Sequence, residues 1–270
     1  WANRLNPNRP PEVEKESHLH GNLAHCAFFE PLEFDRRYVE LPDDAPKKPT
    51  SAQWAAKKPS PESVAAMEWW TDYGKQHSGK RIITAEQAFV AKQQAANLMA
   101  LESVWGGMSM RKLFAMGKPE VSAFWKDPLT GVACRARPDF VVQINERQCI
   151  LIDGKTYSSA ERGEVVRQIA RMGYYRQAGH YTVGYHIASG LEVVAFIFAF
   201  VETDYPYLAG SYMLGEESLS EGLLQQRELV DLYAECVRTN KWPSYTASTQ
   251  TVDLPPYILS SKELGVSYAD

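Results

Sequence analysis

The chain has 270 residues, of which 44% are hydrophobic, and its formal net charge is −4. This composition is typical of a globular protein, and the acidic balance argues against a histone-like or coat-like nucleic-acid binder, whose affinity depends on positive charge. The sequence contains no run of about 18 apolar residues, so no membrane-spanning helix is expected.

The start of the chain and its cysteines bear on its cellular context. The first residue is Trp1 rather than Met, which indicates a piece of a longer polypeptide, and no secretory signal is visible. The cysteine spacing fits neither a zinc knuckle nor an iron–sulfur site. The four cysteines are Cys26, Cys134, Cys149 and Cys236. We therefore expect free buried thiols and a cytoplasmic location.

The first part of the chain predicts helices separated by proline-rich segments. Residues 1–17 are polar and rich in Pro and Asn, which predicts an extended lead-in. A helix is expected over residues 18–30, where Pro31 should end it. Residues 41–60 contain several prolines and lysines and predict a long loop.

Two further helices have clear N-terminal signals. The segment Ser60–Glu62 combines an N-cap residue, a proline at the first helical position and an acid in the first turn. The helix that it begins is expected to end at Gly74. The segment Thr84–Gln87 has the capping-box pattern, and its helix is expected to last to about Trp105.

After about residue 120 the pattern changes from helical spacing to strands. Strands are expected over residues 121–125, 132–144 and 148–152. Turn residues at 127–131 and 145–146 separate them, so the three strands predict a meander.

The rest of the chain predicts a long helix, one or two strands and a closing helix. Helical spacing extends over residues 161–187, and strands are expected over 192–202 and 208–213. An amphipathic helix is expected over 216–239. This order predicts a mixed α/β fold in which a central mixed sheet is flanked by helices.

Two carboxylates and a lysine lie on the predicted central strands. Thirteen residues separate Pro138-Asp139 from Asp153-Gly154-Lys155. Strand side chains alternate between faces, so Asp153 and Lys155 share a face, and strand pairing would bring Asp139 to the same point. Neighbouring carboxylates repel each other unless a cation lies between them, and Mg²⁺ prefers such oxygen ligands. A lysine beside the cation can position or deprotonate a water, so the pattern predicts phosphodiester hydrolysis.

These motifs resemble the PD-(D/E)xK nuclease superfamily, and the longer pattern is similar to the RecE-type exonucleases of prophages (exonuclease VIII). The segments that carry the resemblance are Gly21–Phe34, Pro119–Gly131, Cys134–Asp139, Ile152–Thr156 and Tyr175–Tyr181. The resemblance implies a restriction-endonuclease-like core in a single domain over residues 18–245, followed by an irregular tail over 246–270. Two departures are Asn22, where the family has Thr or Ser, and the missing short helix before the His segment.

The resemblance also implies roles for individual residues. His25, Asp139 and Asp153, with the backbone carbonyl of Gly154, would hold one or two Mg²⁺ ions, with Mn²⁺ as the alternative metal. Lys155 would position or activate the attacking water.

Three more residues enter the catalytic set through the same resemblance. Gln177 and Tyr181 are one helical turn apart and would reach the site from the following helix. Glu120 is an acid that some relatives place beside the metals. Each has a plain structural alternative, because Gln177 and Tyr181 could be ordinary helix-face residues and Glu120 could lie outside the site.

Asp139 and His25 have structural alternatives too. Asp139 follows a proline and could simply cap a turn, although Asp153 and Lys155 in register argue against this. His25 could be a core histidine with a backbone partner. A zinc site with the nearby His18, His20 and Cys26 is not favoured, because zinc needs about four converging ligands.

Arginines are frequent around these motifs. The candidates for DNA contacts are Arg135, Arg137, Arg167 and Arg171. Their positions fit either phosphate contacts or a solvated charged face, and Tyr157, Tyr174 or Tyr175 could stack on a frayed base.

The resulting expectation is a metal-dependent exonuclease that digests linear double-stranded DNA from its 5′ ends and leaves 3′ overhangs. The resemblance also implies a ring-like homo-oligomer and a RecT-type annealing protein as partner, and no membrane partner is expected. Two alternatives are an endonuclease of restriction or repair type on the same fold and a DNA-binding module without activity.

Overall fold

The computed structural model describes residues 16–243 and 248–254. The chain divides into two compact units, and residues 10–231 form the unit that contains the sheets and the candidate site. The described residues of the second unit are 232–243 and 248–254. Most of the predicted lead-in and much of the predicted tail lie outside the described residues, and the proposed bounds of a single domain stay a prediction.

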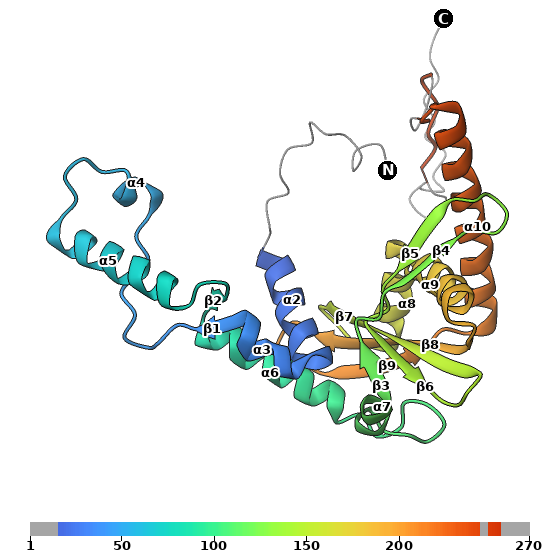
Figure 1. The fold of residues 1–270 in the computed structure, drawn as a ribbon, viewed down its shortest axis with the longest axis horizontal. Helices are drawn as coiled ribbons and strands as arrows, with labels where there is room; N and C mark the ends of the chain where they lie inside the picture. Colours follow the sequence, from blue (N-terminus) through green and yellow to red (C-terminus); the bar gives the residue numbers. More distant parts are fainter. Residues whose placement is uncertain (1–15, 244–247, 255–270) are drawn as a thin grey trace, which may run out of the picture. The chain divides into compact units, whose positions relative to one another are not determined.

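A five-stranded sheet forms the centre of the larger unit (Figure 1). Its strands, in spatial order, are β3 (Gly117–Pro119), β6 (Phe140–Gln143), β7 (Gln148–Tyr157), β8 (Glu192–Glu202) and β9 (Ala209–Met213). β7 and β8 are parallel, and the other neighbouring pairs are antiparallel. The predicted mixed α/β fold with a central mixed sheet is therefore confirmed.

One face of the sheet is covered by the two helices that connect the parallel strands, α8 (Arg162–Met172) and α9 (Tyr174–Ser189). Alternate residues of β8 supply large rings to this layer: Phe196, Phe198 and Phe200. Burial of a phenylalanine side chain is worth about 1.5–3 kcal/mol, so these rings contribute strongly to holding α8 and α9 on the sheet.

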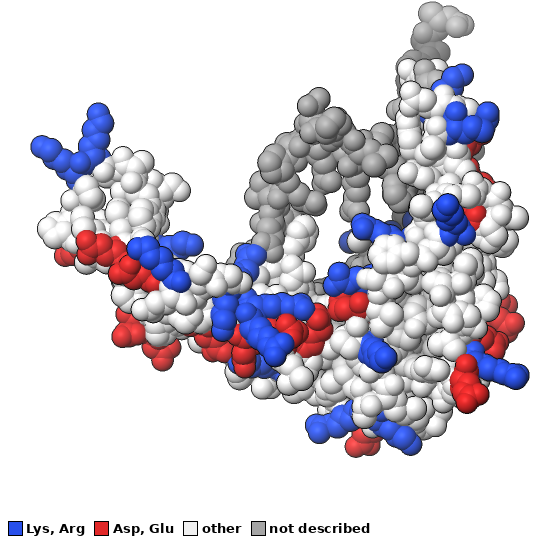
Figure 2. Space-filling model, in the orientation of Figure 1, with Lys and Arg blue, Asp and Glu red and all other residues white. Residues whose placement is uncertain are grey.

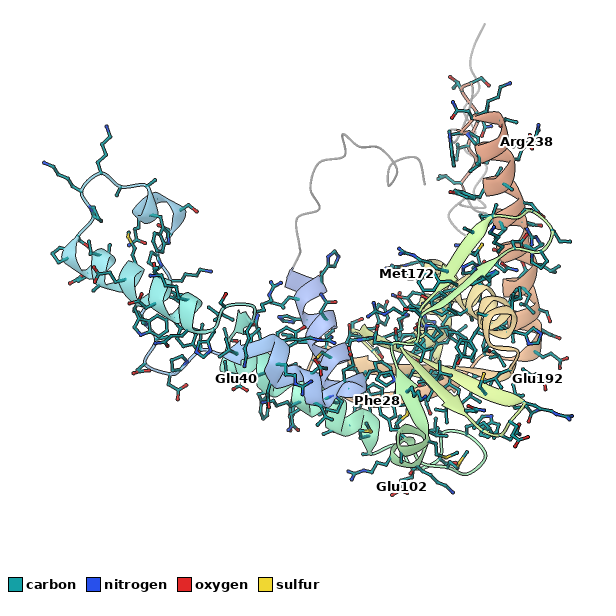
Figure 3. All side chains as sticks on the ribbon, viewed as in Figure 1. Phe28, Glu40, Glu102, Met172, Glu192 and Arg238 are labelled. Carbon is teal, nitrogen blue, oxygen red and sulfur yellow. The ribbon has the colours of Figure 1, made fainter. Side chains whose placement is uncertain are left out.

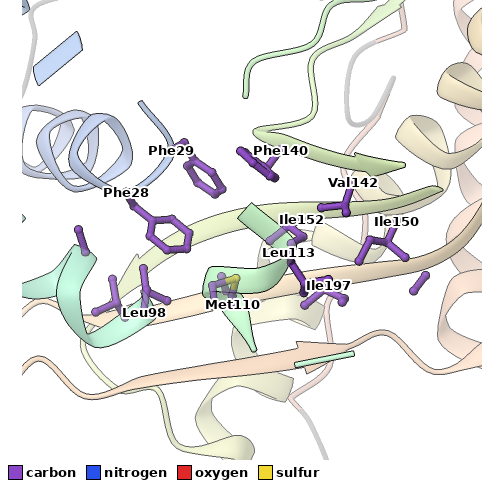
Figure 4. Packing of buried hydrophobic residues seen from close by; sticks show 14 residues of the cluster. Phe28, Phe29, Leu98, Met110, Leu113, Phe140, Val142, Ile150, Ile152 and Ile197 are labelled. Carbon is purple, nitrogen blue, oxygen red and sulfur yellow. The ribbon is translucent and has the colours of Figure 1, made fainter. Parts of the chain in front are cut away.

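The other face is covered by α2 (Glu16–Phe29), α6 (Ala85–Met99) and α7 (Met110–Met116). Figure 4 shows side chains of this layer, and Phe28, also labelled in Figure 3, extends into it from α2. Ile152 of β7 belongs to the same layer. Because side chains alternate along β7, its neighbour Asp153 belongs to the opposite face, where α9 lies.

The first two predicted strands form a hairpin in a sheet of their own, and the predicted three-stranded meander is wrong. β4 (Ala123–Lys126) pairs only with β5 (Ala133–Ala136) in the described part of the chain, around the expected turn at Asp127. The expected strand over 132–144 is broken at Pro138, which cannot donate a ladder hydrogen bond. β6 after this break joins the central sheet and pairs with both β3 and β7.

The predicted helix over 161–187 is also two elements. Gly173 adopts a left-handed conformation with a φ of 67°, which ends α8 and redirects the chain into α9. The closing helix α10 (Glu216–Thr239) has the predicted bounds.

In the first part of the chain, the predicted helix starts are confirmed more fully than the predicted ends. Ser60 caps α5 (Pro61–Gln76), and Thr84 and Gln87 form the capping box of α6. The end of α6 at Met99 comes six residues before the expected one, and α7 was missed. α5 also continues two residues past Gly74.

Pro31 does not end the helical region: it begins a new helix, because proline is well suited to the first helical position. The elements not predicted here are α3 (Pro31–Arg37), β1 (Tyr38–Glu40), α4 (Ser51–Trp54) and β2 (Arg81–Ile83). No helix within the described ranges is long and apolar enough to cross a membrane. All four cysteines are free, as expected, although Cys134 is only half-buried.

Candidate active site

The pairing of β6 with β7 brings Asp139 and Asp153 together. The last pair of the antiparallel ladder is Phe140 with Ile152. Asp139 directly precedes Phe140 and Asp153 directly follows Ile152, so the two aspartates lie side by side just beyond that pair. The Asp153 side chain is 1% exposed, and the Lys155 ammonium forms an ion pair with its Oδ2 atom. The predicted convergence of these three groups is therefore what the structure shows, although Asp139 lies just before β6 rather than on a strand.

Gly154 allows the helix α2 to approach this point closely. A Cβ atom on Gly154 would lie 2.6 Å from the ring of Phe29, a distance that real Cβ contacts do not reach. The Gly154 N–H donates a hydrogen bond of 2.8 Å to Asp139 Oδ2. His25 precedes Phe29 by one helical turn, and its Nε2 atom lies 3.1 Å from Asp139 Oδ1. Because Gly154 of β7 has no side chain, α2 can pack close enough to bring His25 to Asp139.

Glu120 joins the site from the segment after β3, in an unusual backbone conformation. Its φ is 53°, a left-handed value that few residues other than glycine adopt. The Glu120 N–H donates to the Asp139 carbonyl, and its Oε1 atom lies 3.2 Å from His25 Nε2. The Arg137 guanidinium contacts the other carboxylate oxygen. Backbone strain of this kind costs about 1–3 kcal/mol and is concentrated at functional sites.

The helix α9 supplies the two remaining predicted side chains. Gln177 Nε2 donates a hydrogen bond of 2.9 Å to Asp153 Oδ1. Tyr181 lies one turn further along, and its hydroxyl interacts with Gln177, while burial raises its pKa. The Lys155 ammonium also lies 4.6 Å from the centre of the Tyr174 ring, which favours the cation.

The charges in this cluster shift one another's protonation. Burial and the neighbouring Asp139 charge raise the pKa of Asp153 to about 6, although Lys155 opposes the shift. Burial alone would lower the pKa of His25, but its hydrogen bond to Asp139 and the nearby carboxylates give a net increase. For Lys155, burial is likewise outweighed by Asp153 and Asp139, so its pKa is raised.

The donor set fits a hard divalent cation. Asp153 Oδ2 is buried and accepts no hydrogen bond of normal geometry from a described residue, although Lys155 lies beside it. Carboxylate oxygens from Asp139 and Glu120 and the His25 imidazole surround the same region. Mg²⁺ and Mn²⁺ accept such oxygen-rich sets. The individual ligand roles, including that of the Gly154 carbonyl, stay predictions.

Glu30 was missed in the sequence-based set. Ligand atoms of His25, Glu30 and Glu120 lie within 4.8 Å of one another. Arg37 binds both carboxylate oxygens of Glu30 at 2.7 and 2.8 Å, so this acid is neutralised by a neighbour. The available signal was the Glu30-Pro31 pair, five residues after His25 and inside the segment Gly21–Phe34 that carries the resemblance.

The four candidate arginines separate into two groups. Arg137 contacts Glu120, and Arg135 lies on β5, two residues before Arg137. Arg167 pairs with Glu164 on its own helix, and Arg171 lies exposed in the last turn of α8; no contact joins either to the site among the described residues. On the face shown in Figure 2, basic and acidic side chains are interspersed.

The chain is similar to solved structures at low sequence identity. A comparison with curated proteins gives no significant match. Among solved structures, a protein from Eubacterium rectale that is proposed to be an exonuclease is 13% identical, covers 68% of this chain and 72% of its own, and has a TM-score of 0.42. The structure of SSO0001 is 15% identical, covers 42% of this chain and 50% of its own, and has a TM-score of 0.27.

The family comparison covers nearly the whole chain. The model of the PDDEXK-like domain of unknown function (DUF3799) matches residues 3–255, a span that includes every residue of the candidate site. The chain therefore belongs to the family of PDDEXK-like domains of unknown function (DUF3799).

Proposed function

We propose that this protein is a metal-dependent nuclease that hydrolyses phosphodiester bonds. The observation that carries the proposal is the meeting of Asp139, directly before β6, with Asp153 and Lys155 of β7, at a carboxylate that is 1% exposed and paired with the lysine. Membership of a PDDEXK-like family supports the same chemistry.

Each side chain has a role in this reaction. Asp139, Asp153 and His25 would hold one or two divalent cations, and Glu120 would add a further carboxylate beside His25. A bound cation would lower the pKa of a water molecule and offset negative charge on the phosphate. Lys155 would donate a hydrogen bond to the water or the phosphate from a fixed position between Asp153 and the Tyr174 ring.

Two residues would act by positioning these groups. Gln177 holds one oxygen of Asp153 through its hydrogen bond, which leaves the other oxygen oriented toward Lys155. Tyr181, beside Gln177, is expected to contact the substrate rather than a cation, because burial keeps its phenol protonated.

The finer proposal is an exodeoxyribonuclease that acts on linear double-stranded DNA from 5′ to 3′. It rests on the resemblance of the five sequence segments to RecE-type exonucleases. A ring-like homo-oligomer that encloses the duplex and a RecT-type annealing partner belong to the same proposal. Mg²⁺ is the proposed metal, with Mn²⁺ as its substitute.

The test compares an end-labelled linear duplex with a covalently closed circle of the same sequence, with Mg²⁺ titrated and with EDTA. An exonuclease degrades only the linear form and only with metal, and the position of the label gives the polarity. Cleavage of the circle would support the endonuclease alternative instead.

Variants of two residues then assign the activity to the site. Lys155→Met and Asp153→Asn are expected to reduce the rate by a factor of about 100 or more, because each removes a group that stabilises the transition state. Lys92→Met is the matched control, since Lys92 pairs with Glu40 away from the cluster. Full activity of either site variant would refute the assignment.

A further inference from the structure

A hollow beside the catalytic cluster has the chemistry of a nucleotide-binding site. We propose that it holds the unpaired nucleotide next to the scissile phosphate, with the base stacked on the exposed ring of Phe124. The inference rests on the proposed nuclease function and names the form of nucleic acid that the site accepts. The hollow has a volume of about 320 Å³ and is lined by Ser122, Phe124, Arg135, Ala136, Arg137 and Tyr181.

The hairpin that carries Phe124 is fixed to α9. Trp125 points inward from β4, and its ring packs so closely on Gly184 that a Cβ atom there would lie 2.1 Å from the indole. The same indole lies 5.0 Å from the His180 ring, and His180 Nε2 lies 3.2 Å from the Arg135 carbonyl oxygen. Phe124 is therefore presented on a rigid support, which reduces the entropy lost when a ligand binds.

The outer face of the hairpin combines one aromatic ring with cations. Phe124 is 69% exposed and lies directly opposite Arg135 in the β4–β5 register. Strand alternation places Lys126 on the same face as Phe124. Arg137 follows the end of β5 and lines the same hollow as Arg135. Arg137 also contacts Glu120, so this face continues directly into the catalytic cluster.

Single exposed hydrophobic residues are common and need no explanation by themselves. Here the ring lies opposite Arg135 on the β4–β5 hairpin. Arg137 lines the same hollow and contacts Glu120 of the cluster. A purely apolar ligand would not use the cations, and an acidic peptide would not need a flat ring. A nucleotide uses both, because its base stacks on an aromatic side chain and its phosphate pairs with arginine.

The stacking geometry also decides which substrate can bind. In an intact duplex both faces of an internal base are covered by its neighbours, and at a blunt end only the outer face of the terminal pair is free. An unpaired or frayed nucleotide can turn its base onto Phe124 without the loss of a base pair, so it should bind best there. The site should therefore favour single-stranded or frayed ends over blunt, fully paired ends.

The test measures binding of a fluorescein-labelled oligothymidylate by fluorescence anisotropy, in EDTA to prevent cleavage and over a series of salt concentrations. Phe124→Ala is expected to raise the Kd about 5- to 100-fold without changing its salt dependence, because stacking is not ionic. Phe124→Trp should restore binding. Arg135→Ala should lower the salt slope by about one, as for a lost phosphate contact.

The matched control is Leu129→Ala, which removes a residue that is 79% exposed in the turn of the same hairpin. The inference is overturned if Phe124→Ala binds the oligonucleotide as tightly as Leu129→Ala does. It is also overturned if Phe124→Ala changes only self-association in sedimentation, which would make the face a protein interface.

A cleavage assay separates this inference from the proposed function. With wild-type protein and metal, frayed-end duplex should be cut faster than blunt duplex, and Phe124→Ala should remove that preference. An equal loss of rate on both substrates would contradict the stacking role. Absence of any hydrolysis by the wild-type protein would refute the nuclease proposal, whereas the oligonucleotide affinities would still decide the binding site.

Discussion

At the scale of single residues, the candidate site is governed by the cost of burying charge. Asp153 is 1% exposed, and burial together with Asp139 raises its pKa to about 6. An isolated buried carboxylate would be neutral, but Lys155 and the Gln177 amide stabilise the ionised form. A divalent cation would favour that form further, so metal binding and proton release are linked at this residue.

The first prediction concerns the pH dependence of metal affinity. Asp153 and His25 both have raised pKa values and must be unprotonated to bind a cation, so affinity should increase as pH rises. Below about pH 6, each of these two groups that must lose a proton should weaken metal binding about tenfold for every unit by which the pH falls. Titration calorimetry with Mn²⁺ over about pH 5 to 8 measures the slope.

His25→Gln provides the control for this slope. The substitution removes one titrating ligand, so the pH dependence should fall to that of Asp153 alone. An unchanged slope would show that His25 does not bind the metal.

At the scale of elements, glycines set how closely helices and strands approach one another. Gly154 allows Phe29 to pack against β7, and this contact fixes the position of His25 on α2. The helices α9 and α10 meet in a similar way, because a Cβ on Gly179 would lie 2.4 Å from the backbone of Gly222. These contacts align the helix that carries Gln177 with the strand that carries Asp153.

The second prediction compares two helical glycines. Gly74 in α5 has no atom within 4 Å of its Cβ position, so Gly74→Ala should raise the free energy of unfolding by about 1 kcal/mol through helix propensity. Gly179→Ala should lower it by about 1–3 kcal/mol, because the added methyl group forces α9 and α10 apart. Denaturant unfolding measures both, and a stabilising effect of Gly179→Ala would contradict the close packing.

At the scale of the whole molecule, stability and activity should be linked through the same cluster. Asp139, Asp153 and Glu120 bring three acidic side chains into a small volume. Their mutual repulsion opposes folding unless positive charge, such as that of Lys155 or a bound metal ion, offsets it. A bound divalent ion reverses this effect, because the unfolded chain has no such site.

The third prediction is that Mn²⁺ or Mg²⁺ raises the unfolding free energy. At a concentration one hundred times the Kd the increase should be about 2.7 kcal/mol. Thermal unfolding with and without the ion measures it, and NaCl at equal ionic strength is the control. Asp139→Asn should reduce the increase, and an equal increase in that variant would mean that the ion binds elsewhere.

Local signals in the sequence determined much of the fold. The caps at Ser60 and Thr84 act within a few residues of themselves, and so does the Asp127 turn. The apolar run over 192–202 likewise predicted β8, and the helical spacing over 216–239 predicted α10, both with their observed bounds. Asp139, Asp153 and Lys155 could be placed on one site because strand periodicity and a short connection fix their register.

Other features depended on contacts between distant segments. Pro138 separates β5 from β6, but only tertiary contacts such as the packing of Trp125 on Gly184 assign the β4–β5 hairpin to α9 rather than to the central sheet. The left-handed φ of Glu120 and the exposure of Phe124 have no local sequence signal.

The sequence alone therefore determined the three candidate catalytic groups and the strand β7 that carries two of them, because this information lies in local periodicity and short-range pairing. Only the tertiary structure decided how α2, β4, β5 and α9 surround those groups. The physical reason is that such packing depends on the shapes of surfaces far apart in the chain, which no single segment encodes.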